Sequence, residues 1–198
     1  MKHGIMQLTD AFLKALAASA DRSSAPLRTI WPVPGNPVGL VSFSTFDQWR
    51  EFVSQLSLRR SVPDIVRLKF ERGQKQHLLA WLDFALIKAG ELVTLTTLEL
   101  ALTDRYGHKV KDKNGRIHFS RLLRHMPGHD GFTDAQLPVV QRCGGTVVAF
   151  LTGNARPTLA EIRNKLAHGD PFDGNPWGGL LEVVRDLIDY AFRDWPPA

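Results

Sequence analysis

An arginine and a histidine lie five positions apart in the segment Arg163-Asn164-Lys165-Leu166-Ala167-His168-Gly169. Cleavage of RNA without a metal needs a base for the ribose 2′-hydroxyl, an acid for the leaving 5′-oxygen and positive charge at the phosphate. Histidine titrates near neutrality, and a guanidinium stays charged while it holds two phosphate oxygens. The Asn164 amide is able to position the imidazole or a phosphate oxygen. These residue types predict a catalytic trio of Arg163, Asn164 and His168.

The spacing alone is weak evidence, because sixteen arginines and seven histidines would give roughly 0.6 such pairs by chance. The chain contains three of them, namely Arg72 with His77, Arg124 with His129, and Arg163 with His168. The first pair straddles Gly73 and the second straddles Pro127-Gly128, and we expect both to interrupt a helix. Only the third pair is then expected on one unbroken helix.

The helix that carries this third pair has clear ends in the sequence. Thr158 and Glu161 have the spacing of a capping box, which predicts a helix that begins at about Leu159. Gly169, with a proline two positions later, predicts that the helix ends at His168.

The faces of this helix separate its apolar residues from the candidate site. One face carries Leu159, Ile162 and Leu166. At about 100° per residue, Asn164 and His168 lie about 200° and 240° from Ile162, away from the apolar face. A solvent-exposed helix with basic residues in its last turn fits the same pattern without catalysis, with Arg163 paired to an acid. A single imidazole does not readily act as both base and acid, so catalysis would favour two copies of the chain around a two-fold axis.

The remaining elements expected from the sequence are mostly helices. Apolar residues at helical spacing predict helices over 5–20, 45–58, 64–106, 119–125 and 179–192. The longest of these is expected to break near Gly73 and Gly90, and prolines and glycines predict an ordered loop or linker over 23–41. We therefore expect an all-α protein, with a helical and proline-rich extension over 1–62 and an up-and-down helical bundle over 63–198.

The positive charge of the chain is concentrated in one segment. The net charge is +5, and residues 105–125 contain one acid, Asp112, beside seven basic residues. The residues expected to hold an RNA backbone are Lys109, Lys111, Lys113, Arg116, Arg121, Arg124 and, on the candidate helix, Lys165. A solvated, flexible loop is the alternative interpretation of this basic strip.

Other classes of protein and site fit the sequence less well. The one cysteine, Cys143, allows no intramolecular disulfide, which favours a reducing compartment. No run approaches the ~20 apolar residues of a membrane span and no signal peptide is evident, so we expect a cytoplasmic protein. Four of the histidines, His108, His118, His125 and His129, lie in or beside an expected loop, so we expect no metal and no cofactor.

The segment Ile162-Arg163-Asn164-Lys165-Leu166-Ala167-His168-Gly169 resembles the signature of the HEPN superfamily, in which an arginine, often followed by asparagine, precedes a histidine on a late helix. The resemblance covers about residues 74–194. It implies a helical bundle of HEPN type that dimerises through this helix, with many members acting as metal-independent endoribonucleases in toxin–antitoxin and defence systems. One branch carries a tyrosine two positions after the histidine, where this chain has Asp170.

Together these features predict a metal-independent endoribonuclease, a toxin or defence effector that cleaves RNA by attack of the 2′-hydroxyl in a homodimer. Glu99 could orient Arg163 or His168 across the bundle, and an antitoxin or other regulatory protein could bind the chain. Two alternatives remain: a catalytically silent HEPN-like module that binds RNA or protein, and a purely structural helical adaptor.

Overall fold

The computed structural model describes residues 25–169 and 175–195, together with the single positions 10, 14, 18 and 22. The elements are β1 (Leu27–Val33), β2 (Asn36–Phe43), α2 (Phe46–Ser54), α3 (Asp64–Leu79), α4 (Leu86–Val110), α5 (Phe119–His129), η1 (Asp134–Gln136), α6 (Pro138–Cys143), α7 (Val148–Thr152), α8 (Leu159–Ala167) and α9 (Leu180–Ala191). The described chain is thus mostly helical, with one small sheet. The helix expected over 5–20 falls almost entirely outside the described residues.

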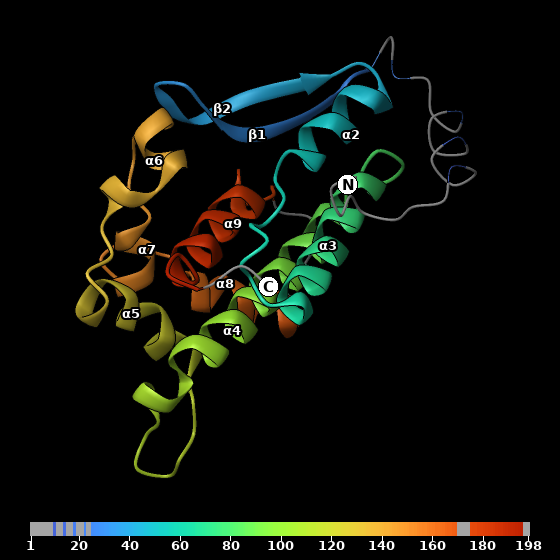
Figure 1. The fold of residues 1–198 in the computed structure, drawn as a ribbon. Helices are drawn as coiled ribbons and strands as arrows, with labels where there is room; N and C mark the ends of the chain where they lie inside the picture. Colours follow the sequence, from blue (N-terminus) through green and yellow to red (C-terminus); the bar gives the residue numbers. More distant parts are fainter. Residues whose placement is uncertain are drawn as a thin grey trace.

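The long helix α4 lies at the centre of the molecule and packs against α3, α5, α8 and α9 (Figure 1). Its buried residues include Leu95, Leu98 and Leu102, which are fully enclosed. They belong to one hydrophobic core that also contains the buried side chains of β1, β2 and α2. This helix therefore provides the frame against which the other helices, including α8, are positioned.

The expectation of a purely helical chain was wrong for residues 27–43, which form an antiparallel hairpin rather than a loop. A turn at Pro34-Gly35 joins β1 to β2, with Gly35 at a φ of 74°. Proline density suggested the loop, but in a two-stranded sheet each strand has a free edge, where proline is tolerated. The register shift between Trp31 and Val33 accommodates Pro32. The hairpin lies across the top of the helices in Figure 1.

The break expected near Gly73 and Gly90 was also wrong, because α3 and α4 run through these two glycines without interruption. The chain instead leaves helical structure between them, over residues 80–85. The glycines lie where α3 and α4 cross: a Cβ on Gly73 would come 2.6 Å from Oγ1 of Thr94, and one on Gly90 would come 2.5 Å from Nδ1 of His77. Their small size allows close approach of the two helices, and tertiary packing outweighs their low helix propensity.

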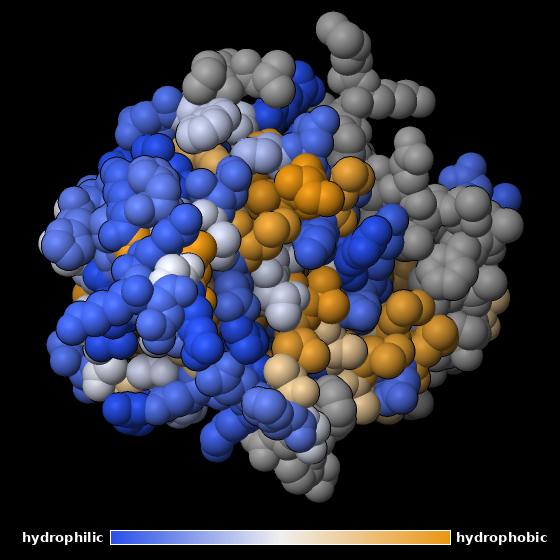
Figure 2. All heavy atoms as spheres, turned by 90° about the horizontal axis from the view of Figure 1, so that it is seen from below, coloured by the Kyte–Doolittle hydropathy of each residue, from blue (hydrophilic) through white to orange (hydrophobic). Residues whose placement is uncertain are grey.

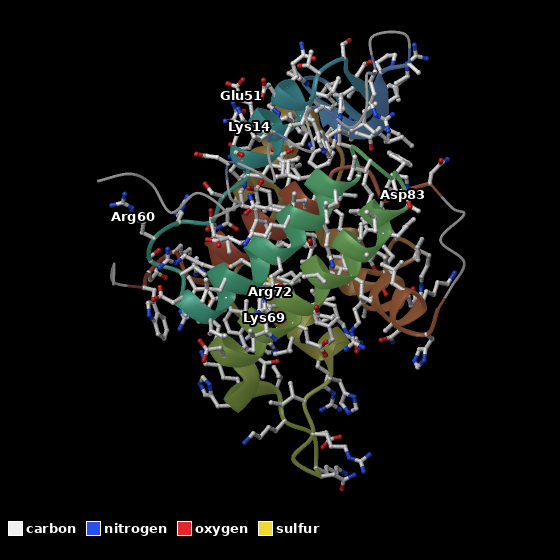
Figure 3. The ribbon with its side chains drawn as sticks, turned by 90° about the vertical axis from the view of Figure 1, so that its right-hand side faces the viewer. Lys14, Glu51, Arg60, Lys69, Arg72 and Asp83 are labelled. Carbon is white, nitrogen blue, oxygen red and sulfur yellow. The ribbon has the colours of Figure 1, made fainter. Side chains whose placement is uncertain are left out.

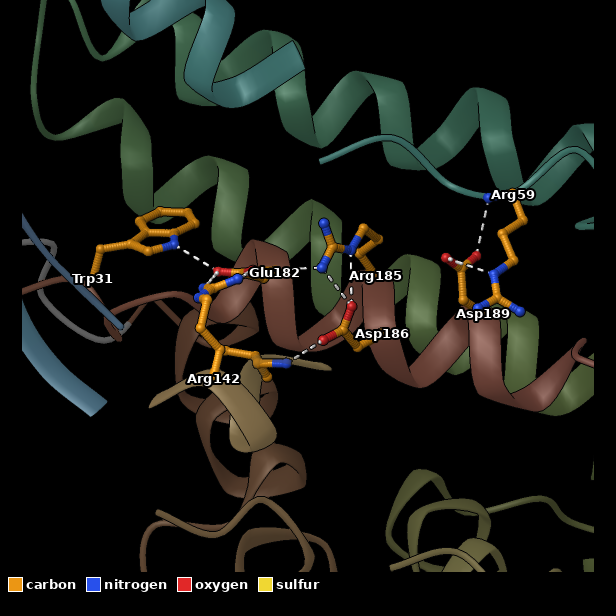
Figure 4. A network of polar contacts seen from close by, with 8 residues as sticks. Trp31, Arg59, Arg142, Glu182, Arg185, Asp186 and Asp189 are labelled. Atoms are coloured by element: carbon orange, nitrogen blue, oxygen red, sulfur yellow. Dashed lines mark hydrogen bonds and ion pairs between the residues drawn. The ribbon is translucent and has the colours of Figure 1, made fainter. Parts of the chain in front are cut away.

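A network of buried charges ties the hairpin and α6 to α9 (Figure 4). The Glu182 carboxylate accepts hydrogen bonds from Nε1 of Trp31, at 2.9 Å, and from both terminal nitrogens of Arg142, at 2.9 and 3.0 Å. One turn further, Asp186 accepts from Arg185 and from the backbone N–H of Val139. Because every one of these buried acids has several donors, the network holds α6 and β1 in a defined place on α9.

Several helix boundaries expected from the sequence are confirmed. Thr45 caps α2, and α9 spans nearly the expected range, whereas α2 ends at Ser54 rather than at residue 58 and α4 continues past residue 106 to Val110. The segment around Asn114-Gly115 is a turn without strands, closed by a hydrogen bond from the Asp112 N–H to the Arg116 carbonyl. In the described part of the chain, none of the helices has the length and apolar character that crossing a membrane requires.

Candidate functional site

Helix α8 is built as its sequence predicts. The Thr158 hydroxyl accepts from the backbone N–H of Glu161 at 3.1 Å, and the Glu161 carboxylate accepts from the N–H of Thr158 at 2.8 Å. The helix ends at Ala167, His168 is its C-cap residue, and Gly169 follows with a φ of 77°. Capping at both ends makes α8 a short but well-defined support for side chains.

The two faces of α8 separate as the wheel geometry predicts. The apolar side chains of Leu159, Ile162 and Leu166 are buried, with 0%, 8% and 8% of their surface exposed. Asn164, Lys165 and His168 are exposed, and Arg163 lies half-buried at the edge between the two faces. The helix thus presents three polar side chains to solvent while its other face packs on α4, α5 and α7.

The Arg163 guanidinium is held by three groups from three places in the chain. Its Nη2 lies 2.5 Å from both carboxylate oxygens of Glu99, which comes from the middle of α4. Its Nη1 donates to Oδ1 of Asn164 at 2.8 Å, and its Cζ lies 5.6 Å from the centre of the Phe119 ring at the start of α5. Only 23% of the Arg163 side chain and 28% of the Glu99 side chain are exposed. The guanidinium is therefore fixed in direction before any ligand binds.

His168 is exposed at the end of α8. Its backbone N–H donates to the carbonyl of Asn164 at 3.0 Å, which closes the last turn. Across residues 25–169 and 175–195, no side chain or backbone group hydrogen-bonds to its ring. Its imidazole is thus accessible to a ligand on the same exposed surface as Asn164, whereas Glu99 contacts Arg163 rather than the imidazole.

The other two Arg–His pairs also lie on continuous helices, contrary to expectation. Arg72 and His77 both belong to α3, and Arg124 and His129 both belong to α5, which runs through Pro127 because proline removes only one helical hydrogen bond there. Continuity of the helix therefore does not single out Arg163 and His168.

Exposure removes one of these two pairs from consideration. Arg72 lies on the outer face of α3 (Figure 3), whereas His77 is 2% exposed and contacts the carbonyl of Gly73 through Nδ1 at 2.8 Å. Burial lowers the pKa of His77 to about 4, so this imidazole stays neutral and enclosed. In contrast, Arg124 and His129 are both exposed.

The basic residues over 109–124 are all exposed, and the structure divides them into two groups, whereas Arg105 is half-buried and donates to the Ala191 carbonyl. Lys109, Lys111, Arg121 and Arg124 line one shallow pocket at the junction of α4 and α5. Lys113 and Arg116 lie on the loop between these helices, and Lys165 lies on α8. Figure 2 shows the end of the molecule from which this loop projects, and hydrophilic residues cover much of one half of it.

The sequence did not identify Phe119, His125 and His129 as members of a site. Phe119 begins α5, and only the packing of α5 against α8 brings its ring to Arg163. His125 and His129 are four positions apart on one helix face, which was a usable signal that the assumed break at Pro127 concealed.

Two other properties bear on the chemistry of this site. Cys143 is buried and 1% exposed. The described residues contain no group of three histidine, cysteine, aspartate or glutamate side chains that could hold a metal ion. Comparison of the chain with protein-family models, with curated proteins and with solved structures found no match.

Proposed function

We propose that the chain is a metal-independent endoribonuclease of HEPN type that cleaves RNA at the exposed face of α8. The observation that carries the proposal is the fixed Arg163 guanidinium, held by Glu99, beside exposed Asn164 and His168 on one capped helix. A cation whose direction is set in advance stabilises developing charge without reorganisation, which is how electrostatic catalysis works best.

Each of the three residues has a distinct role in this reaction. Nη1 of Arg163 keeps one N–H beyond its bond to Asn164, and that N–H binds a non-bridging phosphate oxygen. The NH₂ group of Asn164 donates to the phosphate or to the ribose, because its oxygen is taken by Arg163. His168 transfers protons. Glu99 contacts no substrate and acts as a positioning residue for Arg163.

The reaction balances without a metal or a cofactor. The ribose 2′-oxygen loses its proton to a base and forms a bond to phosphorus, while the bond from phosphorus to the 5′-oxygen breaks and an acid protonates that oxygen. The products are a 2′,3′-cyclic phosphate and a 5′-hydroxyl. One His168 supplies one of these proton transfers at a time, so we propose that a second chain, related by a two-fold axis along α8, supplies the other.

A homodimer in this arrangement would leave the two α8 helices facing one groove. Lys165 and the basic strip would then hold the RNA on either side of the cleaved bond, which makes binding strongly dependent on salt. A toxin or defence role follows if a regulatory protein covers α8, because that would hide Asn164 and His168 together.

The second candidate function is the catalytically silent module, and a specific contact favours it. Glu99 engages Nη2 of Arg163 with both oxygens, and Phe119 lies beside the same guanidinium, so Arg163 also joins α8 to α4 and α5. An arginine with this purely structural role would leave RNA binding without cleavage.

The deciding experiment incubates the purified protein with a mixed-sequence RNA in EDTA, beside the His168→Ala variant. We expect the wild type to release fragments that end in a 2′,3′-cyclic phosphate, and the variant to lose at least a hundred-fold in rate at saturating RNA. His118→Ala is the matched control, since it removes another exposed imidazole, one that pairs with Asp112 and belongs to neither α8 nor the catalytic trio. Its rate should stay within two-fold of the wild type.

Three results would contradict the proposal. Absence of cleavage with RNA binding retained would favour the silent module. Equal rates in the wild type and His168→Ala would remove α8 from the chemistry. Sedimentation of an active protein as a monomer would refute the composite site.

A further inference from the structure

A shallow pocket of about 280 Å³ opens where the C-terminal end of α4 meets α5. Apart from one aliphatic residue, its lining consists of cationic side chains and imidazoles: Lys109, Lys111, Arg121, Arg124, His125 and His129. Among the residues that the structure describes, no carboxylate lines it. A concave surface with charge of one sign concentrates counter-ions, so this pocket attracts anions.

The acids nearest in sequence do not neutralise this charge, because they are engaged elsewhere. Asp112 accepts from Nε2 of His118 and from the loop backbone. Asp130 accepts from the Tyr106 hydroxyl at 2.6 Å and from Arg193 at 2.9 Å. Among residues 25–169 and 175–195, no carboxylate lies within ion-pair distance of the lysines and arginines that line the pocket.

The two imidazoles of the pocket lie against each other. The ring centres of His125 and His129 are 5.0 Å apart, with 28° between the ring planes, and the centre of the His125 ring also lies 5.0 Å from that of Tyr106. Partial burial lowers the pKa of His125, and the positive charges facing it act in the same direction, with only Asp130 opposing them. The charged and titratable groups that face it are His129, Lys109, His108, Asp130 and Tyr106, together with the other cations that line the pocket. An anion in the pocket would reverse this effect and favour the protonated ring.

We propose that this pocket binds a phosphate group, and that the group is a backbone phosphate of the RNA cleaved at α8. Arginine and lysine side chains from two elements converge there, as phosphate recognition requires, and the two imidazoles add further N–H donors. The identity of the phosphate source rests on the proposed function, whereas the preference for phosphate rests on the pocket alone.

The binding test uses a fluorescent 2′-O-methyl RNA with no terminal phosphate, which lacks the nucleophilic hydroxyl and stays intact. Arg121→Gln/Arg124→Gln removes two charges from the pocket, and Lys113→Gln/Arg116→Gln removes two from the neighbouring loop. All four side chains are exposed, so both variants should fold, which circular dichroism checks. We expect the affinity for RNA to fall at least ten-fold in the pocket variant and at most about three-fold in the loop variant. Because one phosphate contact is lost, the slope of log K against log salt concentration should become less steep by about 0.7 in the pocket variant. Equal losses in the two variants would refute the RNA source.

The second part of the test uses inorganic phosphate and a 5′-mononucleotide, followed through the ring proton resonances of the histidines. We expect His125 and His129 to shift in the wild type and not in the pocket variant. Because the pKa of His125 is lowered, RNA affinity should also rise as the pH falls from 7 to 5, and His125→Gln should abolish that rise.

Each combination of results decides one point. Shifts with phosphate but equal RNA losses in the two double variants would assign the pocket to a free phosphorylated molecule. Absence of shifts together with equal RNA losses would overturn the phosphate site. Pocket-dependent binding by a protein that cleaves no RNA would refute only the proposed function, and cleavage without pocket-dependent binding would refute only RNA as the source of the phosphate.

Discussion

Substitution of Gly90 by alanine should destabilise the protein, although alanine favours helices. A Cβ at this position would come 2.5 Å from Nδ1 of His77 and 2.7 Å from its Cε1. His77 cannot move freely, because it is 2% exposed and its Nδ1 must donate to the Gly73 carbonyl at 2.8 Å. The new methyl group therefore separates α3 from α4 or breaks a buried hydrogen bond.

The magnitude follows from three opposing contributions to the free energy of unfolding. Alanine for glycine in a helix interior stabilises by about 1 kcal/mol. Overpacking a core contact costs about 1–3 kcal/mol, and an unsatisfied buried donor costs about 1–3 kcal/mol more. We expect Gly90→Ala to lose about 1–5 kcal/mol in net stability, or roughly 2–20 °C in Tm for a chain of this length.

Gly128→Ala is the matched control, because Gly128 also lies in a helix but a Cβ there would have no neighbour within 4 Å. Without a clash, the helix propensity and the unfolded-state entropy both favour alanine, by about 0.5–1 kcal/mol. Urea unfolding followed by circular dichroism measures both variants. We expect Gly90→Ala to lower the free energy of unfolding and Gly128→Ala to raise it. A Gly90→Ala protein as stable as the wild type would show that α3 and α4 cross less closely than the structure indicates.

Three further predictions concern α8 and α9. Thr158→Ala removes the hydroxyl that caps α8 and should cost about 1 kcal/mol in urea unfolding. Glu99→Gln and Arg163→Ala should be coupled by about 1 kcal/mol in a double-mutant cycle, since they share a partly buried ion pair, and additive effects would show that the pair does not form in solution. Burial raises the pKa of Asp189 from 3.8 to about 6, so the folded state binds this proton more tightly than the unfolded chain does. The stability that this group provides is therefore lost as the pH rises from about 4 to about 6. Over that interval the free energy of unfolding of Asp189→Asn should rise relative to that of the wild type by on the order of 2–3 kcal/mol, and the difference should then stay constant. A constant difference between pH 4 and pH 7 would contradict that pKa.

The sequence predicted structure well where local interactions decide it, and less well where packing does. The capping box at Thr158 and the period of the apolar residues act within one or two turns, so α8 could be predicted with its ends and its faces. The hairpin was missed because prolines were counted without the alternation of buried Leu27, Thr29 and Trp31 on one side of β1. The crossing at Gly90 depends on a partner helix, which a propensity rule does not contain.

The candidate site shows the same division more sharply. Continuity of the helix was the expected reason to prefer Arg163 and His168, yet all three Arg–His pairs lie on continuous helices. The three pairs differ in their tertiary contacts. His77 is enclosed, and the Nε of Arg124 donates within its own helix, to the Ser120 carbonyl, whereas Arg163 is held from another helix by a carboxylate 64 positions away in sequence.

Preorganisation of the cation is therefore the physical basis for choosing α8 over α5. The choice is open to direct test, because Arg124 and His129 are exposed and have the same spacing in sequence. If α8 is the site, His129→Ala should weaken RNA binding and leave the rate at saturating RNA unchanged. His168→Ala should lower that rate and leave RNA binding unchanged. Cleavage that survives His168→Ala and disappears in His129→Ala would move the chemistry to α5 and leave Glu99 with a purely structural role.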